Sequence, residues 1–371
     1  MTRQEFIKYC SAGICGLAGG AFAYSWLHMA DEAAIRNDYK LQNVQGLSQT
    51  ELEILYLASL APSGHNAQPW QIVIKDPQHW LIGSVKERWL PAVDPENREL
   101  VLSIGTFIEN LVRAAGIVGY EVQLNVVGQD GYSSELVEVR LRESRASGLS
   151  AQAIRGRRTI RKNLQSRSIK TEDVHYLVGS EQDRIFYYSL DSSIGIYLSQ
   201  ATVMANQAQI ARDEAQVELA QWIRWSDQEA RQNGTGLTPE SMEMQGLVRW
   251  VAKNFLGKSA VMSKTFRSES INLVQEQVKE CAGWLIIRSG TSTLIDLLAA
   301  GRALQASWLR AYDRSIAFHP MTQILEEAVW KNELTNKLGY NDVQFIVRIG
   351  YVGHYPQPVS LRLPLPNIIS I

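Results

Sequence analysis

The stretch that decides the fold reads Ala61-Pro62-Ser63-Gly64-His65-Asn66-Ala67-Gln68-Pro69-Trp70. Before it, residues 47–60 carry apolar side chains at helical spacing, and the prolines and glycine of the stretch end that helix. After it, residues 70–74 form a short apolar run that is typical of a strand. Because Pro62 and Pro69 restrict the backbone, Ser63 and Asn66 are expected to lie in a rigid polar loop. The stretch therefore predicts a helix, a rigid loop and a strand.

The alternation of helices and strands continues along the chain. Apolar periodicity predicts helices over residues 96–119, 192–232 and 294–312, and a further helical stretch that ends near residue 256. Short apolar or alternating runs predict strands over residues 122–127, 136–141, 283–288 and 343–349. This mixture predicts an α+β fold.

Two of the predicted helices resemble each other. The match joins Gly105-x-x-Ile108-Glu109…Ala115 to Gly301-x-x-Leu304-Gln305…Ala311. Similar residue pairs, beginning at Val122 and Val343, open the strands that follow. Both a true internal repeat and a chance likeness remain open, and the repeat would give two related halves in one chain.

Composition excludes several classes of protein. The 371 residues are 45% hydrophobic and 20% charged, so the chain can bury a core and need not be disordered. With 37 basic and 38 acidic residues, it lacks the basic excess of a nucleic-acid-binding protein. Three cysteines and six scattered histidines show no metal-ligand spacing, so no metal ligand is predicted. No G-x-S-x-G or G-x-G-x-x-G motif occurs.

The N-terminus has the layout of an export signal. Two basic residues lie within residues 1–8, and residues 9–27 follow without a single charge. The segment Thr2–Lys8 resembles a twin-arginine export pattern, except that Gln4 replaces the second arginine. Residues 1–30 are therefore predicted to be a signal or membrane anchor, which would place the protein on the periplasmic side. A packed N-terminal helix in a cytoplasmic protein is the alternative.

A cluster of basic residues lies between the two predicted halves. Arg157, Arg158 and Arg161 fall within five residues, together with Thr159. In a helix, Arg157 and Arg161 would share one face, where their charges would repel unless an anion such as phosphate bound between them. A solvated basic linker is the alternative.

Both polar segments resemble motifs of a known family. The run at residues 61–70 resembles the A-P-S-x-x-N-x-Q-P-W signature of the FMN-dependent nitroreductases, and residues 156–162 resemble their R-R/H-S/T-x-R motif. In this chain the arginine motif follows the loop, whereas it usually precedes it. That order is similar to the Acg-type branch, in which two nitroreductase-like halves are fused, and the resemblance covers roughly residues 48–365.

The resemblance implies a layered α+β sandwich that forms a pseudo-dimer within one chain. Its first half would be residues 48–150, and its second half residues 151–371. One FMN site would form between the halves, because only one arginine motif is present. The residues that the resemblance assigns to FMN are Pro62, Ser63, Asn66, Arg157, Arg158, Thr159, Arg161, Thr322, Gln323 and Arg362. It assigns no catalytic side chain, since flavin chemistry needs little acid–base help from the protein.

The resemblance implies an FMN-binding oxidoreductase that transfers a hydride or electrons through flavin N5. NAD(P)H is a possible donor, and the electron acceptor is not identified by the sequence. A flavin-storing protein is the first alternative, with residues 234–264 as a lid whose apolar side chains cover the site. A membrane-tethered protein without flavin is the second alternative, but it leaves the arginines unexplained.

Overall fold

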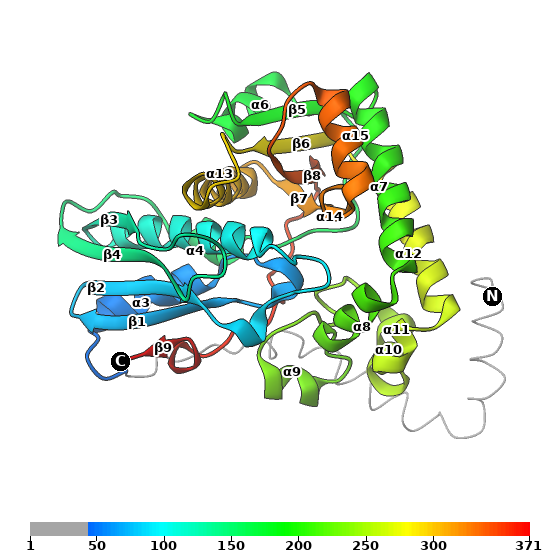
Figure 1. The fold of residues 1–371 in the computed structure, drawn as a ribbon. Coiled ribbons are helices and arrows are strands. Elements are labelled where there is room, and N and C mark those ends of the chain that lie inside the picture. Colours follow the sequence, from blue (N-terminus) through cyan, green and yellow to red (C-terminus); the bar gives the residue numbers. More distant parts are fainter. Residues whose placement is uncertain (1–43) are drawn as a thin grey trace.

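The computed structural model describes residues 44–371, so the predicted signal or anchor at residues 1–30 lies outside the described residues (Figure 1). Nine strands form two separate sheets within the described part of the chain. The first sheet has the order β3-β4-β2-β1-β9, and the second has the order β5-β6-β8-β7. The α+β class predicted from the sequence is confirmed.

The strands of each sheet come mainly from one half of the chain. The first sheet contains β1 (Trp70–Asp76), β2 (His79–Ser84), β3 (Tyr120–Val126), β4 (Glu135–Glu143) and β9 (Ile369–Ser370). The second contains β5 (Ile185–Ser189), β6 (Gly283–Arg288), β7 (Ile316–Pro320) and β8 (Val343–Tyr351). Neighbouring strands are antiparallel except β1 and β9, which are parallel.

Two long helices form the layer between the sheets (Figure 1). They are α4 (Arg98–Ile117) and α13 (Leu294–Asp313), which pack extensively against each other. The helix α3 (Gln49–Ser59) adds to the core on the first-sheet side, and its N-terminus carries the capping box of Ser48 and Glu51. Among the described residues, α4 alone is long and apolar enough to span a membrane, and 78% of its apolar window is buried, as in a core helix.

The two halves repeat one arrangement of elements. The order α3-β1-β2-α4-β3-β4 in the first half matches α6-β5-β6-α13-β7-β8 in the second, where α6 is Thr171–Val178. The sheet orders correspond as well, because β1-β2-β4-β3 matches β5-β6-β8-β7. In this correspondence β7 takes the place of β3. The predicted equivalence of the strands at Val122 and Val343 is therefore wrong, because Val343 opens β8, the counterpart of β4.

The contact between α4 and α13 is reciprocal, as a two-fold relation requires. A Cβ atom on Gly105 would lie 2.9 Å from Cα of Gly301 and would collide with the carbonyl oxygen of Leu298. A Cβ atom on Gly301 would lie 3.0 Å from Cα of Gly105 and would collide with the carbonyl oxygen of Leu102. Only glycine permits so close an approach of the backbones. This reciprocal contact and the matching order of elements favour an internal repeat over a chance likeness.

The second half carries a long insertion between β5 and β6. It contains α7 (Ser193–Ala211), α8 (Asp213–Trp222), α9 (Asp227–Asn233), α10 (Gly246–Phe255), α11 (Lys258–Val261) and α12 (Lys264–Gln277). The single helix predicted over residues 192–232 is wrong. Arg212 and Ile223 have extended backbone, and Ser226 starts a new helix with a capping box to Glu229. Two shorter helices, α14 (Gln323–Glu326) and α15 (Ala328–Leu338), connect β7 to β8.

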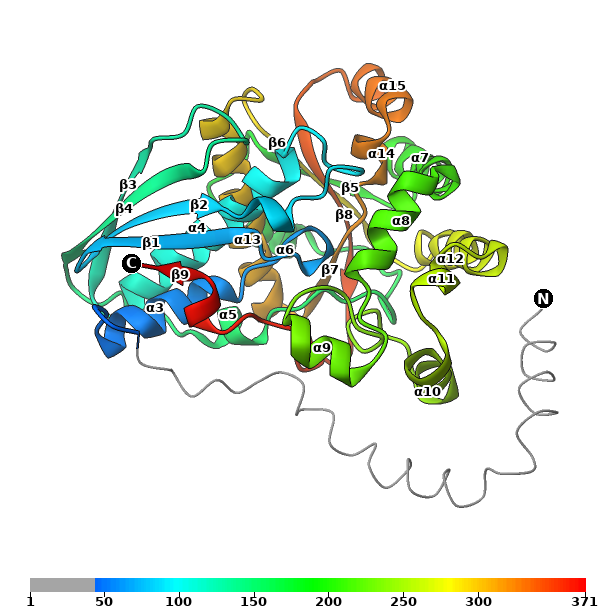
Figure 2. The ribbon, with the colours of Figure 1, turned by 60° about the horizontal axis from the view of Figure 1, so that its bottom comes forward.

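The two halves exchange segments. After β8 the chain returns to the first half, where Ile369 in β9 pairs with Ile72 in β1 (Figure 2). In the other direction, α5 (Gln152–Gly156) packs against α13, and Ile160 N–H then donates to the Phe318 carbonyl of β7 at 3.3 Å. Both segments therefore run along the boundary between the two halves. Two cavities, described below, lie at this boundary.

Candidate functional site

Two adjoining cavities lie where the loop at residues 61–68 meets segments of the second half. Their volumes are about 300 and about 150 Å³. Their common wall is formed by Pro62, Ser63, His65, Thr159 and Arg161. The larger cavity extends toward α14 and the start of α4, and the smaller one toward the C-terminal segment.

The loop is held in an unusual backbone conformation. His65, Asn66 and Gln68 have φ values of 47°, 54° and 53°, which non-glycine residues seldom adopt. Asn66 Nδ2 donates to the Gly236 and Leu361 carbonyls, both at 3.1 Å. Gln68 Nε2 likewise donates to the Gly234 carbonyl at 2.9 Å. Two distant segments thus hold the loop, and the rigidity predicted from its prolines depends equally on these long-range bonds.

The arginine motif is not helical. It follows α5, and Arg157 has extended backbone with φ −59° and ψ 134°. Side chains of an extended chain alternate between two sides, so residues 157, 159 and 161 share one side. All three line the smaller cavity, and Thr159 and Arg161 also line the larger one. The predicted grouping of Arg157 with Arg161 occurs, but the alternation of an extended strand causes it rather than a helix face.

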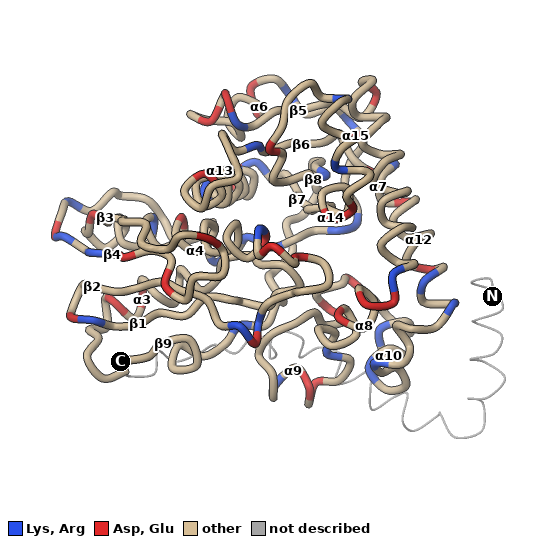
Figure 3. Tube along the Cα trace, in the orientation of Figure 1, with Lys and Arg blue, Asp and Glu red and all other residues tan. Residues whose placement is uncertain are grey.

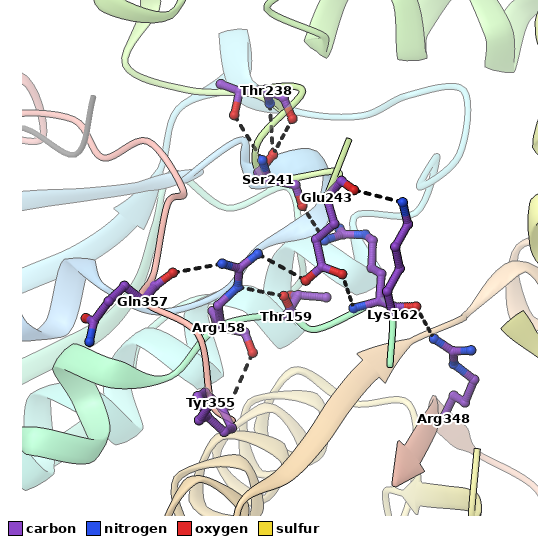
Figure 4. A network of polar contacts seen from close by, with 10 residues as sticks. Arg158, Thr159, Lys162, Thr238, Ser241, Glu243, Arg348, Tyr355 and Gln357 are labelled. Carbon is purple, nitrogen blue, oxygen red and sulfur yellow. Dashed lines mark hydrogen bonds and ion pairs between the residues drawn. The ribbon is translucent and has the colours of Figure 1, made fainter. Parts of the chain in front are cut away.

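Arg158 points to the other side of the motif and lines neither cavity (Figure 4). Its guanidinium forms an ion pair with Glu243 at 3.1 Å and donates to the Gln357 carbonyl at 2.8 Å. The structure therefore separates Arg158 from the other residues that the sequence assigned to the cofactor. Its visible role is to fasten the motif to the insertion.

Three residues that were not predicted from the sequence hold Arg161 in place, and Figure 4 labels them: Ser241, Glu243 and Arg348. Glu243 accepts from the Arg161 backbone N–H at 3.0 Å, and the Ser241 carbonyl accepts from Arg161 Nη1 at 2.6 Å. The fully buried Arg348 of β8 donates to the Arg161 carbonyl at 2.6 Å. These partners lie 80 or more residues away in sequence, so no local pattern could indicate them.

Three arginines give the smaller cavity a positive wall. Arg157 lies over the Trp308 ring at 4.6 Å and donates to the Leu60 carbonyl at 2.9 Å. Arg362 donates to the Leu60 carbonyl at 2.9 Å and to Asn66 Oδ1 at 2.8 Å. Asn66 therefore orients Arg362 besides lining the cavity.

Burial lowers the pKa of Arg161 to about 10, which still leaves it charged at neutral pH. Among the described residues, no carboxylate lines the smaller cavity. Such a wall suits an anion that accepts several hydrogen bonds, for example a phosphate.

The larger cavity is lined by polar atoms that have no protein partner. Within residues 44–371, His65 Nε2, His319 Nδ1 and Gln323 Oε1 are buried without a hydrogen bond. Burial lowers the pKa of His65 to about 4, and burial together with Arg348 lowers the pKa of His319 well below its usual value. Both imidazoles are therefore neutral at neutral pH. Thr322, at the turn before α14, also lines this cavity, so a polar ring would find partners here.

Two carboxyl groups lie at the end of the larger cavity near α14. They belong to Glu99, in the first turn of α4, and Glu326 of α14, which accepts from Thr322 Oγ1 at 2.8 Å. Arg98 lies 2.9 Å from Glu99 and favours its charged form, but burial and the neighbouring Glu326 raise the pKa of Glu99 to about 8. Burial also raises the pKa of Glu326. The pair therefore retains a proton at neutral pH.

The apolar residues expected to form a lid do not cover the site. From the stretch 234–264, Leu237 and Ser241 line the smaller cavity. None of Leu247, Val248, Trp250, Val251 and Phe255 lines either cavity. They belong to α10, which lies at the edge of the molecule (Figure 1). The prediction that these side chains shield the site is therefore wrong.

The described residues contain no group of three or more His, Cys, Asp or Glu side chains that could hold a metal ion. Cys281 is buried, and burial raises the pKa of its thiol to about 11. The chemistry available in the cavities is thus that of arginines, neutral imidazoles, amides and protonated carboxyl groups.

Comparison with known proteins places the chain among remote relatives. No protein-family model matches it. It is 25% identical over 317 residues to the "Probable NAD(P)H nitroreductase PigM" of Serratia sp., an alignment that covers 79% of this chain and 86% of PigM. It is 35% identical over 78 residues to a protein of Mycobacterium tuberculosis whose name provisionally assigns it as an NAD(P)H nitroreductase, covering 21% of this chain and 22% of that protein.

Solved structures resemble the chain only weakly. The nitroreductase-like family protein of Bacillus cereus has a TM-score of 0.33 at 10% identity, and the match covers 62% of this chain and 98% of that one. A nitroreductase of Bacteroides fragilis with bound FMN has a TM-score of 0.32 at 12% identity, covering 56% of this chain and 91% of that one. Likeness at this level carries no argument about the site. By its sequence, the chain is a remote relative of proteins named NAD(P)H nitroreductases.

Proposed function

We propose that the protein is an FMN-binding oxidoreductase of the nitroreductase type. The observation that carries this proposal is the meeting of the loop at residues 61–66 with Arg157, Arg161 and Arg362 around two adjoining cavities. The similarity over 317 residues to a protein named as a probable NAD(P)H nitroreductase supports the same activity.

The residues of the two cavities fit the two ends of FMN. The smaller cavity has a positive wall of three arginines, which suits the phosphate. The larger cavity has unpaired polar atoms on His65, His319 and Gln323, which suit the polar edge of the isoalloxazine ring. When bound, FMN supplies a centre that accepts and releases a hydride. Arg158 is left out of this assignment, because its side chain is engaged with Glu243.

Other residues of the larger cavity could position the flavin ring and the substrate. Thr322 is the N-cap residue of α14 and Gln323 is the first residue of this helix, and both line the cavity wall, where a ring would lie. Glu99 and Glu326 retain a proton near the same turn, so they can donate a hydrogen bond to a substrate. His65 and His319 are neutral, so Arg161 is the cation that lines the larger cavity among the described residues. NAD(P)H, which the relatives' names mention, is the donor we assign; the electron acceptor is open.

We further assign the chain to the Acg-type branch and place it outside the cytoplasm. The order of the two motifs and the repeated halves support the first assignment. The charge-free residues 9–27 support the second, with export or anchoring by residues 1–30. A reporter fused to residues 1–30 should fractionate with the membrane or the periplasm. A reporter confined to the cytoplasm would contradict this localisation.

The activity can be tested on the purified full-length protein. We expect a flavin absorbance spectrum that is bleached when NADPH or NADH is added without oxygen, and restored by an added quinone or nitro compound. A colourless protein that does not take up FMN would contradict the proposal. A yellow protein that neither nucleotide reduces would favour the flavin-storing alternative.

A further inference from the structure

Residues 244–268, which include α10, have a distinctive charge pattern. Between Glu243 and Glu269 the chain has no acidic residue. The same segment contains five basic residues: Arg249, Lys253, Lys258, Lys264 and Arg267. Helix α10 begins this segment, and α11 and the start of α12 complete it. A basic amphipathic segment of this composition is typical of helices that bind membrane surfaces.

Helix α10 buries only part of its apolar face: Val251 and Ala252 pack inward, whereas other apolar side chains of the helix lie in solvent. Phe255 is 67% exposed, Val248 56%, Leu247 44% and the adjoining Leu256 38%. The charged Lys253 of the same helix turns toward the protein instead, where its ammonium group forms ion pairs with Asp227 and, at 2.9 Å, with Glu240. A surface helix of a soluble domain normally buries its whole apolar face, whereas the exposed part of this face is left uncovered by residues 44–371.

The exposed apolar residues lie beside exposed basic residues. Lys258 begins α11, shortly after α10, and Lys264 begins α12; both side chains are exposed. Neither has an ion-pair partner within the described residues 44–371. Figure 3 shows α10 at the periphery of the molecule, with basic positions on and around it.

We propose that α10 and the basic residues that follow it form a docking surface for an anionic phospholipid bilayer. Leu247, Val248, Phe255 and Leu256 would enter the boundary between headgroups and acyl chains, and Lys258 and Lys264 would contact the anionic headgroups. The surface is distinct from the flavin cavities, so this proposal does not depend on the proposed activity.

Charge decides between a bilayer and a second copy of the chain. In a two-fold dimer the same face of each copy would meet, which would bring two basic rims together. Like charges in such a contact repel, whereas an anionic bilayer complements them. The same chain also contains the charge-free residues 9–27, which would bring a bilayer close if they act as an anchor.

The test uses the full-length protein and vesicles of phosphatidylglycerol mixed with phosphatidylethanolamine, compared with pure phosphatidylcholine vesicles. Amide hydrogen exchange over residues 246–257 should slow when the anionic vesicles are added, and should change little with the neutral ones. Slower exchange at this helix reports α10 directly, even if residues 1–30 also enter the bilayer.

Matched variants distinguish binding by this surface from non-specific binding to vesicles. Hydrogen exchange over residues 246–257 is again the readout, because an anchor at residues 1–30 would hold the full-length protein on vesicles by itself. Val248→Ser with Phe255→Ser should reduce the protection by anionic vesicles by roughly tenfold or more, since two large apolar side chains are lost. Ile295→Ser with Val329→Ser is the control, because these side chains are 63% and 73% exposed on α13 and α15. Lys258→Glu with Lys264→Glu should weaken binding of α10 to anionic vesicles and should make this binding less dependent on salt. Lys86→Glu with Lys331→Glu is the control and should change neither.

Two results would overturn the proposal. One is unchanged exchange over residues 246–257 in the presence of anionic vesicles, or equal protection by neutral vesicles. The other is a dimer in sedimentation velocity without lipid that the Val248→Ser and Phe255→Ser pair abolishes, because the occupant would then be a second copy. Flavin content and reduction by NADPH should be normal in all these variants, so failure of one proposal does not affect the other.

Discussion

At the scale of single residues, the arginine motif shows how backbone conformation sorts side chains of the same type. Arg157 and Arg161 reach the smaller cavity, while Arg158 between them pairs with Glu243 on the opposite side. The extended backbone after α5 produces this alternation. The three arginines of this motif thus have two different roles. Substitutions of Arg161 and of Arg158 should therefore have different effects.

Arg161→Ala should weaken FMN binding while the fold is retained. Losing one charge-assisted hydrogen bond to a phosphate costs about 1.5–3 kcal/mol, which is roughly a ten- to hundredfold loss in affinity. Quenching of flavin fluorescence during titration of the flavin-free protein measures the change. A dissociation constant equal to that of the wild type would contradict the assignment of Arg161 to the phosphate.

Arg158→Gln should have the opposite effect: it should lower the stability of the fold and leave the affinity for FMN nearly unchanged. It removes an ion pair that is largely buried, leaving Glu243 without its partner, so we expect a loss of stability on the order of a few kcal/mol. Once folded, the variant should bind FMN about as well as the wild type. Chemical denaturation and the same fluorescence titration check the two parts, and a large loss of affinity at unchanged stability would contradict this division of roles.

The buried carboxyl pair predicts a dependence of stability on pH. The pKa of Glu99 is about 8 in the folded protein against 4.5 for the ordinary group, so the folded state binds the proton more tightly than the unfolded state. Stability due to Glu99 is therefore full below about pH 4.5 and is lost as the pH rises through about 8. Glu99→Gln cannot lose a proton, so its stability relative to the wild type should improve steadily from pH 5 to pH 9.

Urea denaturation of the flavin-free protein at pH 5, 7 and 9 measures that difference. Glu53→Gln is a suitable control, because Glu53 lies on the same side of the fold, in α3, and lines neither cavity. A Glu99→Gln variant whose stability relative to the wild type is independent of pH would show that Glu99 is ionised throughout this range.

At the scale of elements, the crossing of α4 and α13 depends on two glycines. Gly105→Ala should destabilise the protein by about 1–3 kcal/mol, because its Cβ atom would collide with the carbonyl oxygen of Leu298 and force the helices apart. Gly301→Ala should behave in the same way, because the contact is reciprocal. The midpoint of urea denaturation reports both changes.

The same helix provides the control for this prediction. A Cβ atom on Gly116 of α4 would meet nothing closer than Ser147 Oγ at 3.7 Å. Gly116→Ala should therefore stabilise the protein by up to about 1 kcal/mol, through the higher helix propensity of alanine. Equal effects at Gly105 and Gly116 would mean that the crossing tolerates an added methyl group.

At the scale of the whole molecule, the two halves have the same topology, but their sequences provide the elements of only one FMN site. The loop with Pro62 and Ser63 follows α3 in the first half, whereas the corresponding connection after α6, residues 179–184, contains Ser180 but no proline. The chain also contains a single arginine motif. We therefore expect one FMN per chain, although the architecture is that of a pseudo-dimer.

Flavin released by acid from a protein saturated with FMN, measured by absorbance against the polypeptide concentration, gives the stoichiometry. A value near one is expected. A value near two would require a second site on the pseudo-symmetric side, and would contradict the argument from the unequal loops.

Several elements could be predicted from the chain because their information is local. The helices that became α4 and α13 have long apolar periodicity, and their glycines marked the repeat. The strands β2, β5 and β7 escaped prediction. They are short, and β2 and β7 carry a polar or charged residue at one end, so periodicity alone does not distinguish them from loops.

The amino-acid sequence by itself determined the likeness of the two long helices, the helix, polar loop and strand around residues 61–70, and a cluster of arginines that suits an anion. These follow from periodicity, proline and glycine placement, and charge, all of which act between residues close in the chain. Only the tertiary structure decided which arginines face the cavities, that burial raises the pKa of both Glu99 and Glu326, and that part of the apolar face of α10 stays in solvent. Those features depend on which distant segments become neighbours. Burial and long-range hydrogen bonds, such as those of Asn66 and Glu243, select those neighbours, and a local pattern does not encode them.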